Sequence, residues 1–342
     1  MKAVKFIFAA TVAALVSSAA FAEGWSVSGN YRGTAEGYFQ KTIIDSTNDS
    51  SETNQFQTYS YNGGYNLGSY AGFGANRLRF NLKYDGELAG FTFRYDASSL
   101  WFSSDNIKFA QAYLNLVDGL VTLEGGILVD NHTGTDGDIG YAIADGKTGV
   151  RLNISPIEGL DVNAVIAGKS TGAGDPIYGF AAKYTNNAFS VAAGYTPSEK
   201  EIYAGASLTA FEPVSAIGEV VINHDTGALT FGETVNVTLG SLGFGFIASE
   251  ARTSSDADFT FAFYPYVSYD LSGVVTEGLS TGLDVAYEYN GENNYTVKVT
   301  PEVTYKVGAG AIQLYYSFIT SRADTTAHTE TNVIGLAYKV NF

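Results

Sequence analysis

The sequence contains no cysteine, which excludes a disulfide framework, a thiolate metal site, a cysteine nucleophile and lipid attachment through an N-terminal cysteine. Proline is sparse, with 6 residues among 342, and the 19 lysine and arginine residues are outnumbered by 35 acidic ones. No nucleic-acid partner is expected for a chain of net charge −16, because proteins that bind phosphate backbones present basic surfaces.

Long apolar runs are also absent after residue 22, so no transmembrane helix of about 18 residues is expected. The mean hydropathy is nevertheless slightly positive, at +0.02, which is unusual for a soluble acidic protein. A transmembrane β-barrel accounts for both observations, because its lipid-facing residues alternate with polar residues along each strand.

The first 22 residues differ from the rest of the chain. Lys2 and Lys5 precede an apolar run from Phe6 to Ala20, and Ala20-Phe21-Ala22 has the small-x-small pattern of a cleavage site. We therefore expect residues 1–22 to be a secretory signal peptide and residues 23–342 to form one outer-membrane barrel. Loss of the two lysines takes the net charge from −16 to −18.

What the sequence has in abundance is aromatic residues, 24 Tyr and 22 Phe, in segments whose apolar and polar residues alternate. In 76–85, Leu78, Phe80, Leu82 and Tyr84 alternate with Arg77, Arg79, Asn81 and Lys83. Successive strand residues point to opposite faces, so each such segment has one apolar and one polar face. About 18 segments follow this pattern: 25–39, 76–85, 88–97, 107–117, 120–130, 147–154, 160–168, 177–185, 188–195, 200–209, 214–223, 227–238, 241–250, 258–270, 279–289, 294–306, 310–319 and 332–342.

The pattern predicts an all-β protein, a closed antiparallel transmembrane β-barrel of 16–18 strands, 18 by count. Tight turns such as Asp85-Gly86 and Asp118-Gly119 alternate with longer polar connections, as expected for periplasmic turns and outer loops. The longer connections are predicted at 40–75, 98–106, 131–146, 251–257 and 320–331. The polar segment 40–75 is predicted to be the first and longest surface loop.

The last segment places Ile334, Leu336, Tyr338, Val340 and Phe342 on one face. This final strand resembles the C-terminal signal by which bacterial barrel proteins are recognised for outer-membrane assembly. The resemblance implies that Tyr338, Val340 and Phe342 act as an assembly signal for the barrel-assembly machinery. An apolar lipid-facing strand would give the same pattern for structural reasons alone.

Two internal motifs extend the resemblance. Lys108 to Asp130 resembles the strand, turn and strand that precede the third outer loop of Gram-negative general porins. Ser155 to Ile166 resembles the segment after that loop in porins and in spirochaete outer-membrane barrels. Membership of the Gram-negative outer-membrane porin superfamily implies a location among outer-membrane lipids and, by analogy, a homotrimer. The acid-rich third loop and two extra strands depart from general porins.

The resemblance also implies a pore constriction, in which the third loop folds into the lumen and faces a basic wall. The acidic side would be Asp130, Asp136, Asp138 and Asp145 of that loop, and the basic wall Arg32, Arg79, Arg94 and Arg151, which lie on the polar side of their strands. The alternative is that these charges simply solvate a polar interior.

Catalysis is not expected, because His132, His224 and His328 all fall in predicted loops or a hairpin tip. The acidic loop lacks the EF-hand spacing, so neither a metal nor a cofactor is expected. We expect a porin that passes ions and small hydrophilic solutes passively, with a bias towards cations. The alternatives are a channel selective for sugars or other nutrients, and a surface adhesin whose first loop binds a partner.

Overall fold

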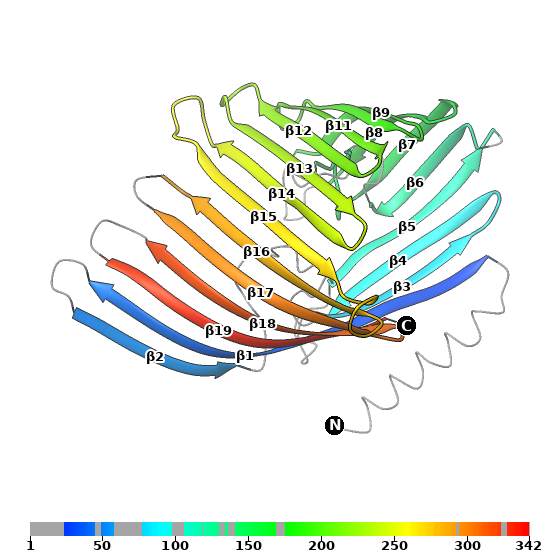
Figure 1. Cartoon of the computed structure of the whole chain (residues 1–342). Coiled ribbons are helices and arrows are strands. Elements are labelled where there is room, and N and C mark those ends of the chain that lie inside the picture. Colours follow the sequence, from blue (N-terminus) through cyan, green and yellow to red (C-terminus); the bar gives the residue numbers. More distant parts are fainter. Residues whose placement is uncertain are drawn as a thin grey trace, which may run out of the picture.

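The alternating segments form β-strands in a computed structural model (Figure 1). The structure describes residues 24–44, 49–57, 77–97, 106–117, 119–129, 134–135, 141–168, 175–291, 294–322 and 327–341. The strands are β1 (Trp25–Ile44), β2 (Asp49–Gln57), β3 (Arg77–Asp85), β4 (Ala89–Ala97), β5 (Asn106–Leu116), β6 (Val121–Ile127), β7 (Thr148–Ile157), β8 (Leu160–Ala167), β9 (Ile177–Thr185), β10 (Phe189–Thr196), β11 (Glu201–Phe211), β12 (Val214–Asn223), β13 (Leu229–Leu239), β14 (Leu242–Arg252), β15 (Thr260–Asp270), β16 (Leu279–Tyr289), β17 (Tyr295–Val307), β18 (Gly310–Arg322) and β19 (Ala327–Asn341).

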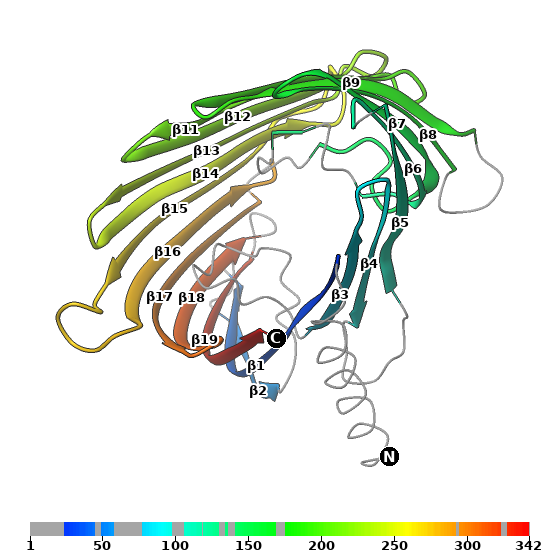
Figure 2. The same ribbon diagram turned by 90° about the vertical axis from the view of Figure 1, so that its right-hand side faces the viewer.

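Each strand from β3 onwards pairs antiparallel with the next, and β19 pairs with β1. The pairing of β1 with β19 extends from Asn30 opposite Asn341 to Ile44 opposite Ala327, which closes the sheet into a barrel. Figure 2 shows the resulting wall around the barrel axis. Closure leaves no sheet edge, as a strand protein surrounded by lipid requires.

The other edge of β1 is shared by two strands. Its first part pairs with β3 and its last part, Glu36 to Ile44, pairs with β2. Within the described residues β2 pairs with β1 alone, so β1 and β2 form a hairpin that continues beyond β3. The barrel itself therefore has 18 strands, the 19 strands less β2, and the predicted fold class is confirmed.

Burial separates the two faces of the wall. On β18, Leu314 is 56% exposed, whereas the preceding residue, Gln313, is 3% exposed. On β19, Leu336 is 47% exposed and the following residue, Ala337, is 2% exposed. Exposed large apolar side chains recur at alternate positions around the barrel, and the polar side chains of the same strands lie on the opposite face. An apolar outside and a polar inside are the arrangement of a lipid-embedded barrel.

Two predicted loops are wrong in part. The segment 40–75 contains the end of β1 and all of β2, and the segment 320–331 contains the end of β18 and the start of β19. His328, predicted to be in a loop, therefore lies in β19 opposite Arg322. These strand extensions consist mostly of polar residues, with Ser and Thr the most frequent, so they carry no apolar alternation to reveal them. No helix in the described ranges is long and apolar enough to cross a membrane.

Candidate pore and its lining

The connection between β6 and β7 is the third loop, and its described residues Thr135 and Tyr141 contact the inner face of the wall. Thr135 Oγ1 donates a hydrogen bond to Glu219 Oε1 on β12 at 2.8 Å, and the backbone N–H of Thr135 donates to Tyr203 Oη on β11 at 3.0 Å. Tyr203 and Glu219 are 1% and 2% exposed and occupy the polar, inward face of their strands. A loop that leaves the wall at β6 thus reaches the inner surface of β11 and β12.

A second part of the loop contacts the same wall. The Tyr141 ring stacks on the Tyr203 ring with 4.4 Å between centroids and 4° between planes. The Tyr141 hydroxyl also lies 2.7 Å from Thr196 Oγ1, at the end of β10. Strands β10, β11 and β12 are neighbours, so they form one docking surface for the loop.

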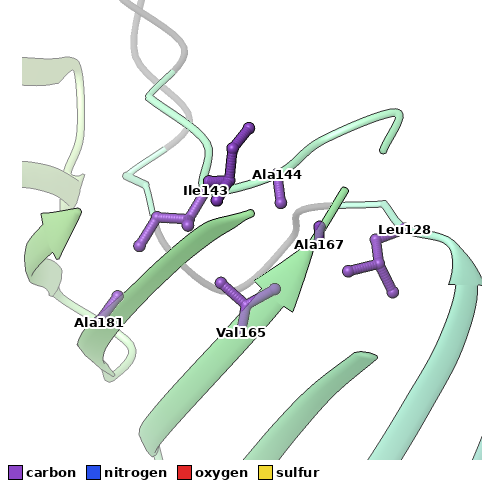
Figure 3. Packing of buried hydrophobic residues seen from close by; sticks show 7 residues of the cluster. Leu128, Ile143, Ala144, Val165, Ala167 and Ala181 are labelled. Carbon is purple, nitrogen blue, oxygen red and sulfur yellow. The ribbon is translucent and has the colours of Figure 1, made fainter. Parts of the chain in front are cut away.

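Small residues make room for the loop. A Cβ atom added to Gly194 on β10 would lie 3.1 Å from Cε1 of Tyr141, and one added to Gly179 on β9 would lie 3.1 Å from Ile143 Cδ1. Glycine at both positions lets the loop approach the strand backbone closely. The stems of the loop then bury Leu128, Ile143 and Ala144 against Val165, Ala167, Ile177 and Ala181 of β8 and β9 (Figure 3).

Arg151 on β7 lies beneath this loop. Its guanidinium donates to the backbone oxygens of Val129 and Ile143, one in each loop stem, at 2.6 and 3.3 Å. It also pairs with Glu124 on β6 at 3.2 Å and has no exposed side-chain surface. Arg151 was predicted to line the basic wall of the pore; in the structure its buried guanidinium instead holds both stems of the third loop.

The other arginines of the predicted wall lie together. Arg79 on β3 and Arg94 on β4 both bind Asp96, at 2.8 Å and 3.3 Å, and Arg32 on β1 interacts electrostatically with Arg79 and Asp96. Asp96 is buried while the two arginines that bind it keep part of their side chains exposed, 18% for Arg79 and 25% for Arg94. Three positive charges around one carboxylate leave this part of the inner wall basic.

Of the acidic side of the predicted constriction, only Asp145 falls within the described residues. It is exposed and follows Ala144 in the returning stem of the loop. Asp130, Asp136 and Asp138 lie outside the described residues, so the constriction stays a prediction. His132 also lies outside them.

The inner wall also has an acidic stretch that was not part of the predicted constriction, although the alternation places Glu302 and Lys298 on polar, lumen-facing positions. Asp284 and Glu288 of β16 and Glu302 of β17 are each 5–7% exposed, with Lys298 of β17 beside them. Alternation along the strand was sufficient to place Asp284 and Glu288 on the inner face, because Leu283, Val285 and Tyr287 occupy the apolar face. Glu219 gave no such signal, since Ile217 and Val221 share its face.

The other residues singled out from the sequence, the histidines and the C-terminal assembly signal, lie near the ends of strands. His224 follows β12 with its Nε2 atom 3.4 Å from the Tyr195 hydroxyl, and His328 Nε2 lies 3.9 Å from Glu330 Oε1. Across the described ranges, no three His, Cys, Asp or Glu side chains are grouped closely enough to hold a metal ion.

Tyr338 and Val340 of the predicted assembly signal are exposed on the outer face, with the Tyr338 ring 5.7 Å from that of Tyr31 on β1. Phe342 is outside the described residues.

No protein-family model and no curated protein sequence matches this chain. Solved structures do match it: OpdL of Pseudomonas aeruginosa at a TM-score of 0.54 and 13% identity, and OccAB4 of Acinetobacter baumannii at 0.53 and 12%. P. aeruginosa OpdK with vanillate matches at 0.51 and 10% identity. Each match covers 92% of this chain and at least 98% of the other. At these identities the matches establish the fold, which this chain shares with the Occ and Opd barrels.

Proposed function

We propose that this protein is a porin-type channel of the bacterial outer membrane that selects among small hydrophilic solutes. The observation that supports the proposal is the docking of the third loop, through Thr135 and Tyr141, on the inner face of β10–β12 in a closed 18-strand barrel. Barrels of this size leave an aqueous lumen, and a loop held inside it narrows the passage to the size of a solute.

Selectivity rather than general diffusion is favoured by the charge on the wall. The arginines around Asp96 suit a carboxylate, and the acids of β16 and β17 suit a cation. One structural neighbour, OpdK, has been solved with vanillate, an aromatic carboxylate. The cation bias expected from the net charge of −18, the value for the chain without Lys2 and Lys5, stays a prediction, because the charge of the wall matters more than the sum.

The exposed apolar outer face supports a location among outer-membrane lipids. Recognition of Tyr338, Val340 and Phe342 by the barrel-assembly machinery and assembly into a homotrimer belong to the same proposal. Cross-linking of the protein in membranes would show trimers, and a monomer only would contradict that part.

The test is tracer flux through proteoliposomes loaded with three solutes of similar size: vanillate, a diamine and a neutral sugar. We expect the two charged solutes to exchange several-fold faster than the sugar at low salt. Equal rates for all three would favour a general diffusion pore. No flux of any solute, from protein that shows a folded barrel by heat-modified gel mobility, would favour the adhesin.

A further inference from the structure

Two carboxylates of the inner wall lie side by side at the β16–β17 pair. Glu302 is opposite Gly282, and Asp284 is opposite Thr300, one inward-facing position further along the ladder. Inward-facing positions on a strand are about 7 Å apart, so the two side chains can converge on one group between them. The two carboxylates repel each other electrostatically, and both are attracted to Lys298.

The hydrogen bonds of the three acids differ. Glu302 Oε2 accepts a bond from Gln313 Nε2 at 2.6 Å, and Glu288 Oε1 accepts one from the Tyr264 hydroxyl at 3.1 Å. Asp284 is 7% exposed, yet within the described part of the chain its carboxylate makes no hydrogen bond and no ion pair within 4 Å. A buried carboxylate without a donor is costly, because its lost hydration is not replaced.

Among the described residues of this part of the wall, acids outnumber cations. Asp284, Glu288 and Glu302 face a single described cation, Lys298, which is opposite Ala286 and so lies between Asp284 and Glu288. Glu302 Oε1 lies over Gly282, where an added Cβ atom would come within 3.4 Å of it. The absence of a side chain at Gly282 keeps the approach to Glu302 open on that side.

We propose that the Asp284–Glu302 pair is a binding subsite for the ammonium or guanidinium group of an organic cation in transit. The proposal rests on the proposed function as a channel. An ammonium group carries three N–H donors and no acceptor, so it can satisfy Asp284 and the second oxygen of Glu302 together. A metal ion is the poorer occupant, because no three acidic side chains in the described ranges are grouped to coordinate one.

The test uses 1,4-diaminobutane as the probe and potassium current through single channels in a planar bilayer. The diamine should block the wild-type current, and Asp284→Asn with Glu302→Gln should raise the half-blocking concentration roughly tenfold or more, the loss expected for charge-assisted hydrogen bonds. Asp284→Glu, which keeps the charge, should retain block.

A matched control removes two charges from the other face of the wall. Glu233 and Glu250 occupy outward-facing positions of β13 and β14, next to Phe231. Glu233→Gln with Glu250→Gln should leave the half-blocking concentration unchanged. Equal block of the wild type and the Asp284→Asn, Glu302→Gln variant would overturn the subsite, and so would stronger block by Mg²⁺ than by the diamine.

Calorimetric titration of the diamine into the detergent-solubilised barrel separates this inference from the proposed function. Binding that disappears in the double variant supports the subsite even when the wild type passes no current, which would contradict the channel alone. No heat of binding with the wild type would overturn the subsite while leaving a measured conductance intact.

Discussion

Two kinds of arginine environment lie on the same inner wall. Arg151 is fully buried, and its guanidinium binds Glu124 and both stems of the third loop. Its positive charge therefore stabilises the position of the loop. Arg79 and Arg94 share Asp96 and keep part of their side chains exposed, so their charge acts on the interior of the barrel. Planar guanidinium groups with five donors on three nitrogens suit both roles, whereas lysine carries its three donors on a single nitrogen and lacks the planar fork.

Removal of the exposed pair should shift ion selectivity. Arg79→Gln with Arg94→Gln removes two positive charges and leaves Arg32 as the remaining cation near Asp96, so this part of the wall loses its net positive charge. We expect the reversal potential across a salt gradient to move towards cations. The shift should shrink at ~1 M salt, where the Debye length is about 3 Å. An unchanged reversal potential at low salt would mean that these arginines do not line the narrow part of the pore.

At the scale of elements, the position of the third loop is set by contacts between its side chains and the strands on which it docks. Tyr141 stacks on Tyr203, Thr135 bonds to Glu219, and Gly179 and Gly194 provide the space. The partners come from four different strands, β9 to β12. Such contacts hold a loop against a rigid wall, which fixes the cross-section of the passage more firmly than a loop held only at its stems.

The position of the loop can be tested by cross-linking, since the native chain has no cysteine. Thr135→Cys with Glu219→Cys should react with a short bifunctional thiol reagent, because the native side chains are in hydrogen-bond contact at 2.8 Å. Thr135→Cys with Val220→Cys is the control, since Val220 points to the other face of the wall. Cross-linking of the control pair and not of the first pair would place the loop elsewhere.

Alternation along the strands predicted most of the fold. It located all 18 strands of the barrel, because one face must be apolar and the other polar wherever the wall lies between lipid and water. It missed β2, in which Phe56 is the one apolar residue and no alternation can therefore be seen. It assigned Arg151 to the correct face but could not give its role, because the burial of a side chain under a loop depends on where that loop returns.

At the scale of the whole molecule, the closed wall has an apolar outside and a charged inside that carries one basic and one acidic stretch. The basic stretch is on β1, β3 and β4, and the acidic stretch is on β16 and β17, with β18 and β19 between them. A solute with charges of both signs would meet complementary groups on neighbouring parts of the wall. In the channel proposed above, the rate of passage is set only by these fixed charges and by the width that the loop leaves, so no energy source is required.

The central claim is that the interior of the barrel is an open, water-filled passage. Reconstitution of the purified, folded protein into a planar bilayer should give stepwise increases of current of one reproducible size. The steps should be absent when the protein has been unfolded by heat before addition. Folded protein that inserts into the bilayer and gives no steps would contradict the account, because the third loop would then close the barrel rather than narrow it.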